Sequence, residues 1–362
     1  MRRKFKKIVF NKLKNGDFHF LLDTAASYFL IYLSILKLKA YRGPLLGIII
    51  PTYRCNLRCE MCGFWKRKPK REFDTREIFK VIDNFAEIGT KAISFSGGEP
   101  LLRKDIFNMI KYSKERGMIT HLATNGTLVN EEVAKKLFDL EIDAISISLD
   151  GATPEIHDDI RGVRGSFEKT VTGLKNLSDI FKYTETSIDV TVLFSEQNFP
   201  EIHKIVKLAN GIGIKSVGLT PLHNLLNEAP GVNRIKAEKI AKAVDDIISI
   251  KKENGIIDNS TEYLEQIKKY FEGADLTSPC SAGVTTCVFD CYGDIFPCYG
   301  HFEMGKKVAN TKNVDLKELW FSKEYDELRK SLFKCKKCIW NCHSEFNLVF
   351  KRPLLLRKFL EG

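Results

Sequence analysis

Between about residues 45 and 254, short apolar runs alternate with segments of helical periodicity, and this alternation restricts the fold more than any other feature. Nearly continuous apolar strands separated by helices indicate an α/β fold, with a parallel sheet covered on both faces. A doubly wound sheet is disfavoured because no GxGxxG motif follows the first run. The predicted strands are 46–50, 92–95, 119–123, 144–149, 188–193 and 216–219. The predicted helices are 75–88, 105–116, 130–140, 166–181, 200–212 and 235–254.

Three cysteines follow the first predicted strand at short intervals: Cys55, Cys59 and Cys62. Soft thiolates select iron–sulfur clusters, zinc or copper(I), and three of them leave one iron of a four-iron cluster open to a small molecule. A zinc ion is the alternative, but it needs a fourth ligand, and the next histidine, His121, is far along the chain.

A glycine-rich turn, Gly97-Gly98-Glu99-Pro100, follows the third cysteine after 34 intervening residues. Glycines let the backbone approach a ligand closely, and the Glu99 carboxylate can accept a hydrogen bond from an ammonium group. Taken alone, the same residues could be an ordinary turn that ends a strand.

The C-x3-C-x2-C spacing followed by this GGEP turn resembles the radical S-adenosylmethionine (SAM) enzymes. The resemblance implies a (β/α)6 partial TIM barrel in which the three cysteines hold a [4Fe–4S] cluster whose open iron binds S-adenosyl-L-methionine. It also implies reductive cleavage of SAM to a 5′-deoxyadenosyl radical that abstracts hydrogen from an unactivated carbon, with an electron donor such as ferredoxin or flavodoxin. The family usually has an aromatic residue before the third cysteine, where this chain has Met61. Phe64 or Trp65 could stack on the adenine instead, or could simply pack beneath the loop.

Polar residues at the ends of the predicted strands are the next site candidates. The resemblance suggests that Asn125, Ser148 and Asp150 lie near the ribose or the methionine part of SAM, and that Arg161 meets its carboxylate. Without the cysteine motif, Asn125-Gly126 and Asp150-Gly151 would be interpreted as turns, and Arg161 as an exposed loop charge.

Seven further cysteines lie between residues 280 and 342. Their spacing resembles the SPASM or twitch extension, which implies at least one auxiliary iron–sulfur cluster. A hairpin turned at residues 292–294 would bring Cys280 and Cys298 together. The predicted metal ligands are Cys280, Cys298, Cys335, Cys338 and Cys342. A structural zinc site is the alternative, and the roles of Cys287 and Cys291 stay open.

Both ends of the chain mix basic and apolar residues. Residues 1–14 contain seven lysines and arginines, residues 18–38 are largely apolar, and the tail resembles the first segment; the net charge is +11. These ends could lie on an anionic membrane surface, or the N-terminal segment could cap the barrel. The longest uncharged apolar stretch has 13 residues, which is too short to span a bilayer. Nucleic-acid binding is disfavoured because no recognised module appears.

The abundant cysteines and the missing signal-peptide pattern lead us to expect a cytoplasmic protein, with peripheral attachment at the inner face of the membrane as an option. We expect a helical arm at 1–44, a barrel at 45–275, an auxiliary cluster domain at 276–345 and a tail at 346–362. The predicted substrate is a peptide or a lipid-like molecule. The alternative from another class is a non-catalytic, metal-stapled binding protein with a basic surface for membrane or nucleic acid.

Overall fold

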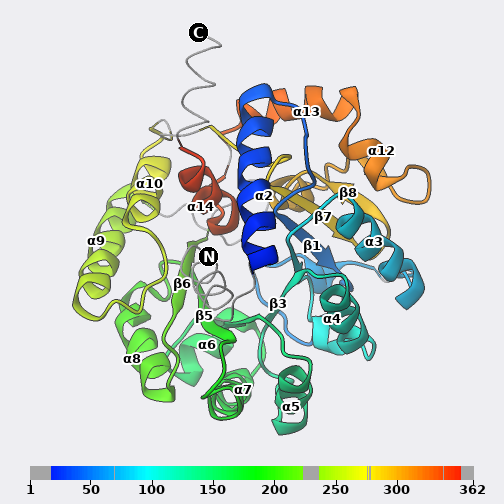
Figure 1. Ribbon diagram of the computed structural model, residues 1–362. Helices are drawn as coiled ribbons and strands as arrows, with labels where there is room; N and C mark the ends of the chain where they lie inside the picture. Colours follow the sequence, from blue (N-terminus) through cyan, green and yellow to red (C-terminus); the bar gives the residue numbers. More distant parts are fainter. Residues whose placement is uncertain are drawn as a thin grey trace.

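A parallel sheet with helices around it forms the centre of the molecule (Figure 1). The computed structural model describes residues 18–68, 70–222, 236–274, 276, 279–336 and 338–351, without the side chains of residues 18–20 and 342. Within this part the sheet has nine strands in the order β6-β5-β4-β3-β2-β1-β7-β8-β9.

The first six strands are parallel neighbours, as the sequence predicts, and they confirm the partial-barrel fold. Their bounds are β1 Leu46–Ile50, β2 Ala92–Phe95, β3 Ile119–Thr124, β4 Ala144–Ser148, β5 Ser187–Phe194 and β6 Val217–Pro221. The predicted helices are present as α3 Thr75–Glu87, α4 Ile106–Glu115, α5 Glu131–Asp139, α7 Ser166–Ile180, α8 Ile202–Ile212 and α9 Ala237–Asn254. Two helices of the barrel region were not predicted: α6 Pro154–Arg161, which is short, and α10 Thr261–Phe271.

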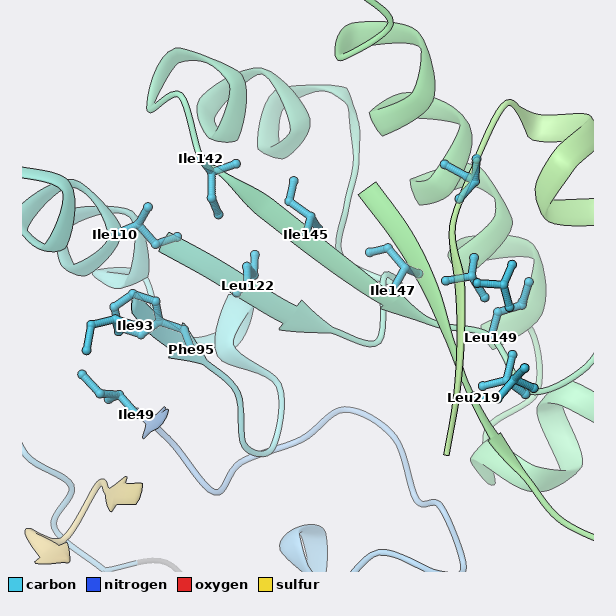
Figure 2. Close-up of a cluster of buried hydrophobic side chains, with 14 of the residues drawn as sticks. Ile49, Ile93, Phe95, Ile110, Leu122, Ile142, Ile145, Ile147, Leu149 and Leu219 are labelled. Atoms are coloured by element: carbon cyan, nitrogen blue, oxygen red, sulfur yellow. The ribbon is translucent and has the colours of Figure 1, made fainter. Parts of the chain in front are cut away.

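The two faces of the barrel strands differ in character. Apolar residues such as Phe95, Leu122 and Ile147 face the helices and form the main core (Figure 2). Because side chains alternate along a strand, their neighbours face the opposite, inner side. There His121 Nδ1 lies 2.8 Å from Ser94 Oγ, and its Nε2 lies 2.8 Å from Ser146 Oγ. The inner face of β2, β3 and β4 is therefore polar here, although the runs were expected to be almost continuously apolar.

The C-terminal hairpin continues the barrel sheet. Strand β7 Thr286–Asp290 pairs with β1 in parallel, and β8 Asp294–Phe296 and β9 Ala309–Asn310 follow in antiparallel pairing. The predicted auxiliary domain thus shares one sheet with the barrel.

Four short helices complete the C-terminal part: α11 Tyr299–Glu303, α12 Leu316–Trp320, α13 Lys323–Phe333 and α14 Asn341–Val349. Helix α14 links the two ends of the barrel sheet, because Glu345 accepts a hydrogen bond from Ser260 N at the start of α10 and Asn347 accepts one from Ser281 N just before β7.

Helix α2 (Phe18–Lys37) crosses the amino ends of β1 and β7 and stands in front of the sheet in Figure 1. Its inner face packs against Leu45 and Val284, which precede these strands. Asp23 pairs with Arg42 at 3.2 Å and also with Lys91. One face of this helix thus caps the barrel, while residues 1–17 and 352–362 lie outside the described part of the chain. No helix in that part is both long and apolar enough to cross a membrane.

Candidate active site and auxiliary cluster site

The three cysteines lie on the loop that leaves the carboxyl end of β1, where parallel barrels place their active sites. Cys59 is buried, and Cys55 and Cys62 are half-buried. Leu57 N donates to Cys55 Sγ at 3.4 Å, and Cys62 N donates to Cys59 O at 3.2 Å, so the loop curls around the thiols. Burial raises the pKa of Cys62 and the charges of Cys59 and Cys55 raise it further, as expected of three thiols that lie close together.

Burial sets the protonation of two of these thiols, Cys55 and Cys62. It raises the pKa of Cys55 and raises that of Cys62 to about 12, so both are neutral in the protein alone. Iron binding must then displace these protons, as is general for thiolate ligands. Within the described residues, no three cysteine, histidine or acidic side chains are arranged as ligands of a single metal ion. In a four-iron cluster each thiolate binds a different iron.

The glycine turn after β2 packs directly against the segment that leads to Cys55. A Cβ on Gly98 would lie 2.1 Å from Arg54 O, and one on Gly97, which has φ +127°, would lie 2.6 Å from a methyl group of Ile50. Gly98 N donates to Thr52 O and Glu99 N donates to Arg54 O. Only glycine fits between these two backbones, so the turn fixes where the cysteine loop starts.

Glu99 holds the next strand end in place. Its buried carboxylate accepts hydrogen bonds from Thr124 Oγ1 at 2.7 Å and from Asn125 N at 2.8 Å. Asn125 Nδ2 in turn donates to Asn56 Oδ1, inside the cysteine motif, at 2.9 Å. Asn56 was not predicted as a site residue, and only its position between two ligating cysteines could have indicated it. The structure therefore brings Glu99, Asn125 and the cysteine loop together.

Arg161 and Asp150 form a buried ion pair beside the same loop. Arg161 Nη2 lies 2.6 Å from Asp150 Oδ2, and the charge of Cys59 also acts on this guanidinium and raises its pKa. Arg161 O accepts from Arg58 N at 3.0 Å, so the end of α6 touches the cysteine motif. The buried Arg161 Nε has no acceptor among the described residues. A ligand carboxylate would supply one.

Three other residues were considered for SAM binding from the sequence: Ser148, Phe64 and Trp65. Ser148 is half-buried at the end of β4, opposite Thr191 of β5. Phe64 is buried and stacks on Phe302 at 5.6 Å, so its ring is used in packing. Trp65 is half-buried and its Nε1 donates to Cys59 O at 2.9 Å, which holds the loop.

The donor set around this loop fits the cluster and SAM. Three converging thiols supply the iron ligands, the Gly97-Gly98 backbone lies where no side chain could fit, and a buried guanidinium has an unused donor. These features are independent of one another and meet at the carboxyl ends of β1 to β4.

Four of the predicted auxiliary ligands also come together. The pKa of Cys280 is raised by burial and further by the charges of Cys338, Cys298 and Cys335. Burial raises the pKa of Cys298 to about 12 and that of Cys338 to about 11. The β7–β8 hairpin turns at Gly293 as predicted, with φ +91°. The side chain of Cys342, the fifth predicted ligand, lies outside the described residues.

The two cysteines left open by the sequence face different surroundings. Cys287 is fully buried in the main core with Phe289 and Ile295. Cys291 packs with Tyr53 and Phe64 in a smaller apolar cluster between the two cysteine sites. That cluster also contains Phe296 and Phe302, and Cys62 and Tyr299 pack against it.

Comparison with known proteins agrees with these two sites. The family model of the radical SAM superfamily matches residues 49–209, and that of the SPASM iron–sulfur cluster-binding domain matches residues 280–342. An AdoMet-dependent heme synthase of Methanosarcina barkeri is 29% identical over 297 residues, which are 75% of this chain and 81% of that protein. The mycofactocin maturase MftC of Mycolicibacterium smegmatis is 30% identical over 251 residues, covering 68% of this chain and 62% of that protein.

Solved structures share the fold. The structure of native anSMEcpe with bound AdoMet aligns with a TM-score of 0.63 at 18% identity, over 88% of this chain and 98% of that one. Streptococcus suis SuiB bound to the precursor peptide SuiA aligns with a TM-score of 0.65 at 16% identity, over 79% and 67%. The chain therefore belongs to the radical SAM superfamily, as an enzyme with a SPASM domain whose cofactors are a [4Fe–4S] cluster, S-adenosyl-L-methionine and at least one auxiliary iron–sulfur cluster.

Proposed function

We propose that this enzyme abstracts a hydrogen atom from an unactivated carbon of a peptide substrate. The observation that carries the proposal is the convergence of Cys55, Cys59 and Cys62 with the Gly97-Gly98 turn and the buried Arg161. When bound, the cluster and SAM supply reductive cleavage to a 5′-deoxyadenosyl radical. The protein's own part is to bind, orient and exclude water.

We assign each predicted SAM-binding residue except Pro100 a role in holding SAM. The Gly97-Gly98 backbone lies against the methionine amine with Glu99, and Arg161 donates to the methionine carboxylate through its unused Nε. Asp150 keeps the guanidinium in position. Asn125 and Ser148 lie within the same ring of strand ends and hydrogen-bond the ribose.

The apolar cluster between the two cysteine sites supports electron transfer to or from the auxiliary cluster. Phe64, two residues after Cys62, stacks on Phe302 at 5.6 Å. Phe302 lies 5.3 Å from Tyr299, which follows the auxiliary ligand Cys298. We assign the auxiliary cluster to exchanging electrons with the substrate radical, and a ferredoxin or flavodoxin to reducing the first cluster.

A peptide is favoured because the SuiB structure, which shares this fold, holds a precursor peptide, and because a maturase is among the relatives. A tetrapyrrole is the second candidate, because the heme synthase of Methanosarcina barkeri matches over 81% of its length. The excess of basic residues suits an anionic tetrapyrrole, too. A lipid-like substrate is the third.

The decisive experiment measures 5′-deoxyadenosine formed from SAM by anaerobically reconstituted, dithionite-reduced protein. The control is a Cys55→Ala/Cys59→Ala/Cys62→Ala variant. We expect product from the parent protein alone. Absence of product at full iron and sulfide content, also with peptide, tetrapyrrole and lipid substrates present, would refute the proposal.

The substrate class is tested in the same assay. The enzyme is given three kinds of substrate in separate reactions: peptides encoded near its own gene, iron coproporphyrin and isoprenoid lipids. The increase in 5′-deoxyadenosine formation is then compared between the three. Stimulation by a peptide with a mass change in that peptide supports the first candidate, and a mass change in the tetrapyrrole alone supports the second.

A further inference from the structure

Helix α2 presents an apolar face to the outside of the molecule. At helical spacing, one side of it carries a row of residues with no charge. The row is Leu22, Ala25, Ala26, Phe29, Leu33 and Leu36. Leu22 is 74% exposed and Phe29 is 62% exposed, while the opposite side buries Ile31 and Ile35. Surface helices normally turn polar residues outward, so this row indicates a further apolar contact.

Charge is kept away from this face. The helix has no charged residue between Asp23 and Lys37. Asp23 pairs with Arg42 and Lys91 at the barrel, so its carboxylate does not repel an anionic surface.

Basic sequence adjoins this helix along the chain at one end, and adjoins its packing partner Phe350 at the other. Residues 1–16 contain seven lysines and arginines and no acidic residue, and only Asp17 separates them from the start of α2. At the other end, the Phe350 ring stacks on Tyr28 of α2 at 5.5 Å. The residues that follow Phe350 include Lys351, Arg352, Arg357 and Lys358. An apolar strip between two basic segments is the pattern of helices that lie in a membrane interface.

We propose that the outer face of α2 binds the surface of an anionic bilayer. Leu22 and Phe29 enter the apolar side of the interface, and the basic ends bind the headgroups. A second copy of the chain is a poorer occupant, because it would bring two equally basic surfaces together at a net charge of +11 each.

The position of α2 fixes the orientation of the attached enzyme. The helix crosses the amino ends of β1 and β7, whereas the cysteine loop and the Gly97-Gly98 turn leave the carboxyl ends of β1 and β2. A bilayer bound at α2 therefore faces the side of the barrel opposite the SAM site. Attachment localises the enzyme and leaves the active site open to a water-soluble substrate, which favours a peptide over a membrane lipid.

Flotation with vesicles tests this proposal on the reconstituted full-length protein. The vesicles are phosphatidylcholine alone, or phosphatidylcholine mixed with phosphatidylglycerol. We expect flotation with the anionic vesicles, weakened by salt, and a decrease of about tenfold or more in binding for Leu22→Ser/Phe29→Ser. Tyr183→Ser is the matched control, because Tyr183 is 92% exposed elsewhere on the surface and its loss should change nothing.

A second variant reports the contact directly. Phe29→Trp should shift its fluorescence to shorter wavelengths when anionic vesicles are added. The proposal would be overturned by an unshifted spectrum, or by equal flotation of the double variant and the parent protein. It would also be overturned if the parent protein bound no vesicles but formed a dimer that the double substitution disrupts. Because flotation does not depend on SAM cleavage, its result is independent of the proposed radical chemistry.

Discussion

The Tyr53 hydroxyl donates a 2.6 Å hydrogen bond to Asp290 Oδ2. Tyr53 lies two residues before the first cluster cysteine, and Asp290 ends β7 in the C-terminal part. Both are buried. The other oxygen of Asp290 accepts from Tyr292 N and Asp294 N, which form the hairpin turn. A single carboxylate thus couples the cluster loop to the hairpin of the auxiliary domain.

Replacing this tyrosine should loosen the coupling. In Tyr53→Phe the buried Asp290 oxygen loses its partner, and we expect a loss of about 1–3 kcal/mol in the free energy of unfolding. Urea denaturation of the reconstituted protein measures it. Tyr183→Phe, on an exposed ring, should leave the midpoint unchanged. Equal midpoints for both variants would show that the bond contributes nothing.

The glycine turn gives a sharp steric prediction. Gly98→Ala places a methyl group 2.1 Å from Arg54 O, so the segment before Cys55 must move and iron retention should fall well below that of the parent protein. Gly63→Ala is the matched control, because Gly63 directly follows Cys62, has φ −86° and has no atom within 4 Å of an added Cβ. Iron analysis and the visible absorbance of the cluster check both. Full iron content in Gly98→Ala would contradict the steric argument.

Arg161 should contribute to SAM affinity through its planar guanidinium. Arg161→Lys keeps the charge but loses the several N–H donors with which a guanidinium can bind Asp150 and a ligand carboxylate at the same time. We therefore expect the Kd for SAM to rise by roughly tenfold or more. Calorimetric titration measures the Kd. Arg164→Lys, three residues on at an exposed position, should bind SAM like the parent protein. Unchanged affinity in Arg161→Lys would remove this residue from the site.

Stability should fall in mild acid because of His157. This imidazole is fully buried beside Asp150, whose N–H donates to Nδ1 at 3.3 Å, and burial lowers the pKa of His157 to about 3. The unfolded chain takes up the proton near pH 6.5, whereas the folded chain does not. The contribution of neutral His157 to the free energy of unfolding is therefore complete above pH 6.5. It declines by up to about 1.4 kcal/mol per pH unit as the pH falls toward 3.

The variant His157→Asn keeps an acceptor near the Nδ1 position and removes the titration. The difference in free energy of unfolding between the parent and this variant, measured from pH 7 to pH 4.5, should shrink steadily with falling pH. A constant difference would mean that the pKa of His157 is the same in the folded and the unfolded protein.

Substitution of an auxiliary cysteine should cost the protein iron, whereas substitution of the core cysteine Cys287 should not. Cys298→Ala and Cys335→Ala should each lose the auxiliary cluster, and with it a large part of the iron and sulfide, while the first cluster still forms. Cys287→Ala should retain all of it, because that thiol lies in the main core. Equal iron loss in all three variants would show instead that any cavity in this region disrupts the domain.

Much of the barrel and of the cysteine sites could be predicted from the sequence, because short apolar runs and closely spaced thiols are local signals. The pairing of β7 with β1 could not, since Leu46 and Thr286 are far apart in the chain and share no pattern. The ion pair of Arg161 with Asp150 was missed for a similar reason: each residue was assigned to the ligand separately.

The N-terminal segment shows another limit of the sequence. The apolar character of α2 is evident in the sequence, but the side that packs on Leu45 and Val284 depends on the strands above it. Only the structure shows that the charge-free row containing Leu22 and Phe29 points outward.

The β1–β7 pairing has a consequence for how the chain is made. Until residues 286–290 are synthesised and paired, β1 is an edge strand with the sequence LGIII, which is apolar, uncharged and rich in β-branched residues. Such an edge offers free N–H and C=O groups to any other chain, and it is a site of aggregation. In a protein truncated before the hairpin, this edge of β1 would stay exposed permanently. The auxiliary domain therefore protects the barrel from self-association, independently of any iron it carries.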